Sequence, residues 1–487
     1  MQGFVPFRRP MSHLRKELIV NITFLLLANL LIKPYYIFFV ERKVQNDAGT
    51  GLWGLYFTIF SLSMVPQILL DLGITNYANR EIAADKFKYD QFWKTAIWIK
   101  PVLAILFLVV FVAISYLGGY YHSFKPLVIW IGFNQILASF ILFGRAFISG
   151  SGRYRLDSFF SIADKLIFIV LFISAFLMHS LPLDRFLMIQ SISMAISVIL
   201  VIYFVVNSLE KIEFNFEIDF SKVKQIIFTS FPYAMVFVLM VLYCRMEPVW
   251  IDQLRADGAE QSGHYAAAYR ILDAANMMSF LFAGLLLPMF SRSAATDPVE
   301  AQGLFDLSWK LMTGLSVLIA IPIVFNHQFI MHFLYPDDHG KILDLVMVNL
   351  IPLTINYLMI TLITALGKLN QLNKWFLISI GINIVLHFLF TNRLGARGAA
   401  WAAVMTQLST TIVLVIFILK YKLIQFKMQY IIDLSLMIII GIGVVFLLDK
   451  VNVSPWYKLI LSCIIFPIFL FITGLIPLKS IFQYLKR

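Results

Sequence analysis

The chain has 487 residues, of which 60% are hydrophobic and 14% are charged, and its formal net charge at pH 7 is +12. Soluble globular domains carry about 25% charged residues, so this composition excludes them and indicates a protein that crosses the membrane many times. The basic residues lie in short segments between apolar runs and form no separate basic domain, which argues against nucleic acid as a partner.

Apolar runs of about twenty residues, the length that spans a bilayer as a helix, recur along the chain. They lie near residues 18–40, 52–72, 93–117, 124–146, 157–179, 184–206, 224–245, 264–290, 309–333, 343–366, 372–391, 397–419, 429–448 and 457–477. The sequence therefore predicts an all-α fold with about fourteen membrane helices. The first run is too long for a signal peptide and has no small-residue cleavage site after it, so we expect it to remain as helix one.

The order of the runs indicates two lobes and an appended pair of helices. A polar linker near residues 208–224 separates six helices from the six that follow. We therefore expect domains at residues 1–210 (helices 1–6), 211–423 (helices 7–12) and 424–487 (helices 13 and 14). No loop exceeds roughly 25 residues, too few to fold as a domain alone, so any function must lie among the helices.

Two short motifs at equivalent positions support an internal repeat. Gly54-x-Tyr56 opens the second helix and Gly263-x-Tyr265 opens the eighth, each just after a predicted outer loop. Repeats of this kind occur in transporters, whose sites lie between the two halves.

The distribution of Lys and Arg predicts the orientation in the membrane. An even number of helices places both termini on one side, and cytoplasmic termini put about 24 basic residues on inner segments against about 11 on outer loops, as the positive-inside rule requires. The four others, Lys33, Lys100, Lys165 and Arg270, fall inside predicted helices. We expect both termini to be cytoplasmic.

The cysteines and histidines of the sequence do not indicate a disulfide, a metal site or a catalytic site. Cys244 and Cys463 lie in apolar runs far apart, so we expect packing residues and neither a disulfide nor a metal site. His387 is the only histidine well inside a predicted helix, and we expect it to be packed and hydrogen-bonded. We find no metal-ligand cluster, no pairing of a nucleophile with a base and no Gly-rich phosphate loop.

Three stretches of sequence carry a likeness to a known family. They are GLWGLYFTIFSLSMVPQILLDLGITNYANREIA (51–83), TSFPYAMVF (229–237) with the Asp252 loop after it, and HYAAAYRILDAANMM (264–278). With these stretches the chain resembles the polysaccharide flippases, of O-antigen type, in the multidrug/oligosaccharidyl-lipid/polysaccharide exporter superfamily.

The resemblance implies two six-helix lobes, as in the multidrug exporters, around a cavity lined mainly by helices 1, 2, 7 and 8. It further implies that the cargo is a lipid-linked oligosaccharide on a polyprenyl pyrophosphate, moved from the inner to the outer leaflet of a bacterial inner membrane. Membrane lipids, a polysaccharide polymerase and other assembly proteins are the partners it implies.

Basic residues inside the helices are the candidates for binding such a cargo. Lys33 lies about seven residues from the outer end of helix one and Arg270 about six from that of helix eight, so both are expected at similar depth. Arg and Lys are the natural partners of phosphate, which makes Lys33 and Arg270 candidate binding residues. The alternatives are that Lys33 snorkels to the headgroups and that Asp273, at i+3, neutralises Arg270.

Asp273 and Lys165 complete the candidate binding set. Asp164 and Lys165 are adjacent, so we expect that they do not face each other and that one of them lines the cavity.

The candidate gate residues lie near helix ends. They are Asp71 and Arg80 on the cytoplasmic side, and Arg245, Glu247 and Asp252 on the outer side. Between the lobes they could form ion pairs that break when the cavity opens; the alternative is that they are solvated loop charges. Lys100, about seven residues into helix three, is expected to snorkel inward.

The sequence favours a flippase that works by alternating access through a cationic cavity, and we do not expect an enzyme. One alternative, a multidrug or cation antiporter of the same fold, calls for uncompensated acids inside the helices. Another, a membrane-embedded polysaccharide polymerase or transferase, calls for a sizeable outer loop. No cofactor is expected, and coupling to H⁺, to Na⁺ or to the membrane potential stays open.

Overall fold

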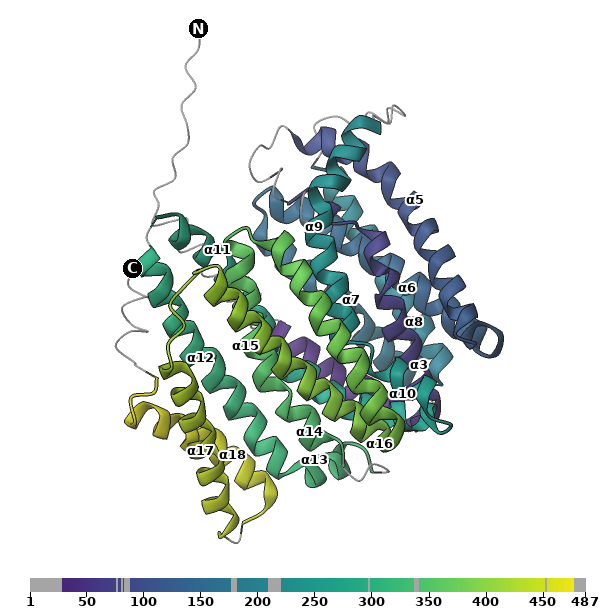
Figure 1. Ribbon diagram of the computed structural model, residues 1–487. Coiled ribbons are helices and arrows are strands. Elements are labelled where there is room, and N and C mark those ends of the chain that lie inside the picture. The colour runs from purple at the N-terminus through teal and green to yellow at the C-terminus, as the bar shows by residue number, and fades with distance from the viewer. Residues whose placement is uncertain are drawn as a thin grey trace. The chain divides into compact units, whose positions relative to one another are not determined.

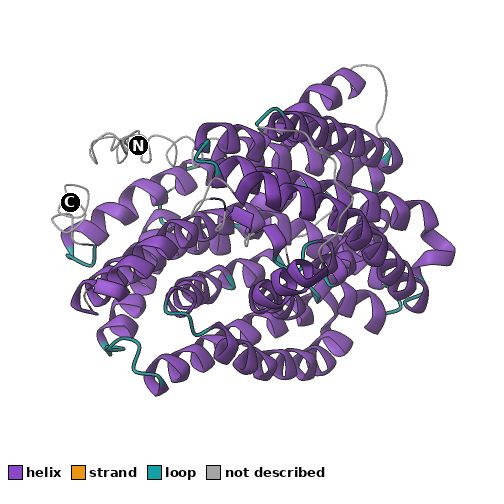
Figure 2. Ribbon diagram, turned by 90° about the horizontal axis from the view of Figure 1, so that it is seen from above, coloured by secondary structure: helices purple, strands orange, loops and turns teal. Residues whose placement is uncertain are grey.

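The computed structural model describes residues 29–75, 78–79, 82, 88–176, 182–208, 220–296, 298–336, 341–451 and 453–476. These residues form helices joined by short loops, with no strand among them (Figure 1 and Figure 2). Within these ranges nine helices are long and apolar enough to cross a membrane, or ten if one bent pair counts as a single span. The predicted all-α, multi-pass fold is confirmed, and the count of fourteen is approximate because several runs correspond to broken helices.

Two compact units make up the chain. The first comprises the residues up to Val44 together with 66–231, and the second comprises 45–65 together with the residues from Pro232 onward. We describe each unit by itself. The division into domains at residues 1–210, 211–423 and 424–487, which the order of the apolar runs indicates, stays a prediction.

Long helices dominate the first unit. They are α5 (Lys88–Leu117), α6 (Tyr120–Gly150), α7 (Tyr154–Phe176) and α8 (Leu183–Val206), preceded by helical residues 29–35, the π-helix η1 (Tyr36–Glu41), the start of α2 (Arg42–Ala48) and the 3₁₀ helix η2 (Pro66–Leu70). The π-helix begins two residues after Pro34, whose missing N–H disturbs the regular i→i−4 pattern of helix one. Helix one is therefore irregular next to Lys33.

Aromatic side chains form much of the first unit's core. Trp93 of α5 stacks on Phe143 of α6, with ring centroids 5.8 Å apart, and meets Phe147 edge to face at 5.2 Å. Such pairs add about 0.5–1.5 kcal/mol each beyond the area they bury. They hold α5 and α6 together around Lys100.

The second unit holds the remaining helices. They are α3 (Thr50–Met64), α10 (Glu247–Leu254), α11 (Gly258–Thr296), α12 (Pro298–Phe325), α13 (His327–Leu334), α14 (Leu343–Val348), α15 (Leu350–Ala365), α16 (Leu369–Lys420), α17 (Gln429–Asp449) and α18 (Pro455–Ile472). Helix α9 (Phe220–Cys244) begins in the first unit and ends in the second. The predicted span 52–72 is divided, because α3 ends at Met64 and the chain continues as 3₁₀ helix from Pro66.

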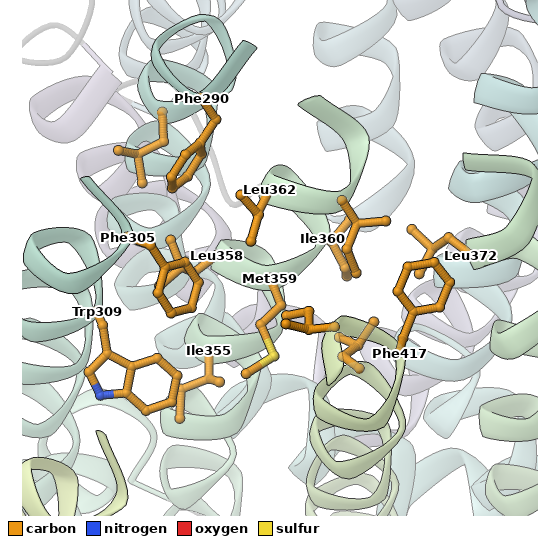
Figure 3. Packing of buried hydrophobic residues seen from close by; sticks show 14 of the residues in the cluster. Phe290, Phe305, Trp309, Ile355, Leu358, Met359, Ile360, Leu362, Leu372 and Phe417 are labelled. Carbon is orange, nitrogen blue, oxygen red and sulfur yellow. The ribbon is translucent and has the colours of Figure 1, made fainter. Parts of the chain in front are cut away.

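Helix α15 is the centre of the second unit. Most of its residues are apolar and 12 of the 16 are buried, as expected of a helix surrounded by others. Figure 3 shows Phe290 of α11, Phe305 of α12 and Phe417 of α16 packed around Met359 of α15 and its neighbours. This core fixes α11, which carries the candidate site.

A glycine divides the 52-residue helix α16 into the two predicted spans near 372–391 and 397–419. Gly395 has φ +60° and ψ −137°, a conformation outside the helical region that an L side chain rarely adopts. A Cβ on Gly398 would lie 2.1 Å from the Phe390 carbonyl oxygen, so the chain folds tightly back on itself here.

The expected C-terminal pair of helices, α17 and α18, packs on α12. Their shared core includes Val317 and Ile321 of α12, Met437 of α17 and Phe466 of α18. Lys310 of α12 pairs with the buried Asp433 of α17 at 3.4 Å.

Helices α3 and α11 cross with their backbones in contact. A Cβ on Gly54 would lie 1.9 Å from the Ala259 carbonyl oxygen, and a Cβ on Gly263 would lie 2.0 Å from that of Thr50. Only glycine fits at either position. The two Gly-x-Tyr motifs singled out in the sequence thus pack against each other.

Candidate functional site

The candidate site of the second unit begins at a break in a membrane helix. Helix α9 ends at Cys244 and α10 begins at Glu247, and the two are bent by 44°. The Pro248 carbonyl oxygen accepts hydrogen bonds from Thr58 Oγ1 of α3 at 3.4 Å and Ser262 Oγ of α11 at 3.0 Å, which hold the break in place. Discontinuous helices form the binding sites of many transporters, and here Arg245 lies at the break.

Three charged side chains meet beside this break. Arg245 Nη1 lies 2.9 Å from Asp273 Oδ1, and Arg270 Nη1 lies 3.4 Å from Asp273 Oδ2. The side chains of Arg245, Asp273 and Arg270 are 29%, 16% and 11% exposed, respectively. We call these three residues the arginine cluster; it is held in place by Asp273 and remains partly accessible.

Aromatic rings cover the faces of both guanidinium groups. Arg270 Cζ lies 5.0 Å from the centre of the Phe57 ring, and Arg245 Cζ lies 5.1 Å from that of Tyr269. Tyr269 donates a hydrogen bond from its hydroxyl to the Cys244 carbonyl oxygen at 3.0 Å, which fixes this ring. Cation–π contacts of this kind add about 0.5–2 kcal/mol each and orient the planar groups.

The arginine cluster carries a net charge of +1 when all three groups are ionised, since one carboxylate faces two guanidinium groups. Guanidinium groups bind phosphate oxygens through two parallel hydrogen bonds, so two arginines suit a phosphate or diphosphate. The arrangement can hold an anion between helices. The pair of Arg270 with Asp273, stated above as the alternative to cargo binding, is present, and the gate candidate Arg245 shares the same carboxylate.

Two further gate candidates lie on α10. Glu247 is only 2% exposed, and its Oε2 has no hydrogen-bond partner within the described ranges. Asp252 is half-buried near the other end of α10. Their function at a gate stays a prediction.

A second group of charges lies in the first unit. Lys33 is half-buried and interacts electrostatically with Lys165, Asp164 and Arg145. Lys165 Nζ lies 4.6 Å from the centre of the Tyr36 ring and 3.2 Å from Asp164 Oδ2. The expectation that Asp164 and Lys165 do not face each other was wrong, because the long lysine chain bends back to its neighbour. Since Lys33 and Arg270 lie in different units, a shared cavity stays a prediction.

The buried Lys100 pairs with the half-buried Asp71 in the first unit. Lys100 Nζ lies 3.0 Å from Asp71 Oδ1 and donates to the Leu70 carbonyl oxygen at 2.9 Å and to Ser139 Oγ at 2.8 Å. The expectation that Lys100 snorkels was wrong. These acceptors hold its ammonium group in the interior, and the whole residue is only 2% exposed. Arg80, the other cytoplasmic gate candidate, lies outside the described residues.

Of the residues expected to be packed, His387 is buried and Cys244 is half-buried, whereas Cys463 is exposed. His387 is fully buried, and its Nδ1 lies 2.9 Å from Thr391 Oγ1. Cys244 and Cys463 are both free. Within the described ranges no group of three or more His, Cys, Asp or Glu residues could hold a metal ion.

Sequence reasoning missed Phe57, Tyr269 and the pairing of Arg245 with Asp273. Tyr269 directly precedes Arg270 and lies in one of the stretches that carry the family likeness. No local signal relates Phe57 to Arg270, because their contact depends on the glycine crossing of α3 and α11.

Known structures share this fold. An inward closed conformation of the lipid II flippase MurJ aligns with a TM-score of 0.65 at 14% identity over 96% of this chain and 99% of its own. An inward-facing multidrug resistance MATE family transporter of the MOP superfamily aligns at 0.62 and 12% identity over 82% and 96%. A mutant of the Vibrio cholerae MATE transporter VcmN aligns at 0.57 and 16% identity over 85% and 98%. The chain thus shares the fold of these membrane transporters.

The family follows from the sequence itself. The profile described as polysaccharide biosynthesis protein matches residues 18–294, more than half of the chain. No curated protein matches. The chain belongs to the polysaccharide biosynthesis protein family and is a multi-pass membrane protein with a transporter fold.

Proposed function

We propose that the protein is a flippase that moves a lipid-linked oligosaccharide, joined to its lipid through a pyrophosphate, from the inner to the outer leaflet. The observation that carries the proposal is the arginine cluster, which places two guanidinium groups with a net positive charge inside a membrane-spanning region. The family supports a function in polysaccharide biosynthesis, and the MurJ-like fold supports movement of a lipid-linked sugar.

The physical problem of such transport is the polar headgroup. Sugars and phosphates lose several kcal/mol per unsatisfied polar group in hydrocarbon, so they need a polar, protein-lined route. The arginine cluster supplies hydrogen bonds and charge for the pyrophosphate, while the lipid tail stays in the bilayer. Lys33 and Lys165 would offer a second basic group from the first unit, and Asp71, Arg80, Glu247 and Asp252 remain gate candidates.

The cellular setting follows from the cargo. We place the protein in the bacterial inner membrane with both termini cytoplasmic, where it would hand an O-antigen type glycan to a polysaccharide polymerase and other assembly proteins. With the cell interior negative, an anion moving outward gains about 2.3 kcal/mol per charge per 100 mV, so the membrane potential favours export.

Transport by purified protein in liposomes tests the proposal. Wild-type protein should move a labelled lipid-linked oligosaccharide between leaflets without changing it chemically. Replacing both Arg245 and Arg270 by Ala should lower the rate about a hundredfold or more, because each lost charge-assisted hydrogen bond contributes about 1.5–3 kcal/mol and every ~1.4 kcal/mol is a factor of about ten.

The matched control is Arg255→Ala. Arg255 is a partly exposed arginine of the same unit that pairs with Asp257 at 3.1 Å, away from the arginine cluster. This variant should transport normally. Full transport by the Arg245→Ala/Arg270→Ala variant would show that the arginine cluster is not the cargo-binding site. Conversion of the cargo to a new product by wild-type protein would show that the protein is an enzyme.

A further inference from the structure

Glu247 is a buried carboxylic acid without an ion pair among the described residues; only its own backbone N–H and Arg245, beyond ion-pair distance, favour its ionised form. It begins α10 directly after the helix break, is 2% exposed, and forms no ion pair with any residue that the structure describes. Arg245, two residues earlier, directs its guanidinium group to Asp273 instead. An unpaired ionised carboxylate in such surroundings loses several kcal/mol of solvation, whereas a protonated one does not.

The titratable and charged groups around Glu247 come from several helices that pack against α10. Those that interact with Glu247 are Arg245 and Cys244 at the end of α9, and Tyr265, Tyr269 and Asp273 on α11. From α16, His387 approaches α10 through its stacking on Trp250, with ring centroids 5.7 Å apart, and α3 contributes the uncharged Thr58. Phenol and thiol groups stay neutral at physiological pH, and both oxygens of Asp273 already contact arginine.

The protonation of Glu247 sets the charge of the whole assembly. Arg245, Arg270 and Asp273 sum to +1. An ionised Glu247 reduces this sum to zero, and a protonated Glu247 leaves it at +1. An anion entering beside the arginines would therefore meet either a repelling carboxylate or a neutral acid.

We propose that Glu247 is a proton-binding site that controls the charge of the arginine cluster, so that one proton and the phosphate of the cargo bind together. This inference rests on the proposed function, in which the cluster holds phosphate. The proton comes from water and adds to the carboxylate of Glu247, with no change in oxidation state. By linkage, the proton strengthens anion binding and the anion strengthens proton binding by the same factor.

Anion binding to the purified full-length protein as a function of pH tests this inference. Inorganic sulfate is the probe, because it stays divalent from about pH 5.5 to 8.5, where a perturbed carboxyl group titrates. Calorimetry should show sulfate binding to wild-type protein with proton uptake, and an affinity that falls by up to about tenfold per pH unit once Glu247 ionises. The Glu247→Gln variant should bind sulfate without proton uptake. At every pH its affinity should equal that of wild-type protein at acidic pH.

The control is Glu260→Gln, which removes an exposed carboxyl group in the first turn of α11 and should keep the wild-type pH dependence. If wild-type protein binds no sulfate at any pH, the assignment of the arginine cluster as an anion site is wrong, and the proposed function loses its main support. If sulfate binds but Glu247→Gln retains the full pH dependence, only the proton site is wrong.

Infrared difference spectroscopy of wild-type protein covers the case in which Glu247→Gln does not fold. Sulfate binding at neutral pH should produce the carbonyl stretch of a newly protonated carboxylic acid. If sulfate binds and this band is absent, the inference is overturned.

Discussion

Single charged residues were identified in the sequence more reliably than their partners. A charge inside a long apolar run is visible in the sequence, and Lys33, Lys100, Lys165 and Arg270 were all found in this way. The partner depends on which side chains the fold brings within reach. Lys100 meets Asp71 because η2 returns the chain to the middle of α5, and Arg245 meets Asp273 because the helix breaks at Arg245.

The buried lysine of the first unit makes a prediction at this scale. Lys100→Met should lower the free energy of unfolding by about 3 kcal/mol, because it removes the positive charge that pairs with the Asp71 carboxylate and leaves that carboxylate, among the described residues, with hydrogen bonds from Thr75 alone. Thermal unfolding in detergent measures the effect. Lys125→Met, which changes an exposed lysine of the same unit, is the control. Equal melting temperatures for the two variants would show that the Lys100 pair contributes nothing to stability.

Helices as elements were largely predictable, whereas their interruptions were not. The lengths of the apolar runs gave the positions of α5, α8, α9 and α17 to within a few residues. The same measure joined α3 to η2, because hydropathy does not register the lost hydrogen bond at Pro66. It ended the seventh run at residue 245, next to the break, but gave no sign that the chain continues as helix α10 after a 44° bend.

The crossing of α3 and α11 makes a prediction at the scale of elements. Gly54→Ala should destabilise the protein by about 1–3 kcal/mol, because the new methyl group overlaps the Ala259 carbonyl group and forces the helices apart. Gly51 of the same helix has open space around it, so Gly51→Ala should be neutral or slightly stabilising. Thermal unfolding of the two variants compares them directly, and identical melting curves would contradict a close crossing.

The whole molecule was predictable as a class from its composition and its repeated apolar runs. The fold confirms an all-helical membrane protein, and the family confirms the likeness carried by residues 51–83 and 264–278. The compact units were not predictable from chain order, because residues 45–65 pack with helices that follow Pro232. Contacts between distant segments define such a unit, and hydropathy contains no information about them.

Orientation in the membrane is the prediction for the whole chain. Alkaline phosphatase fused after Arg487 should be inactive and green fluorescent protein fused there should fluoresce, because the positive-inside rule places this end in the cytoplasm. Fusions truncated after Lys450, between α17 and α18, should behave in the opposite way. Phosphatase activity after Arg487 would reverse the assigned topology.

The contact of Gly54 with Gly263 also has a consequence for biosynthesis. The second helix enters the membrane about 200 residues before its partner is made, an interval on the order of ten seconds or more at ribosomal speed. During that time lipid tails must cover the bare backbone groove at Gly54. We therefore expect the nascent N-terminal part to stay incompletely assembled until translation passes Gly263, which makes this stretch of synthesis the period in which chaperones and membrane proteases can act on the chain.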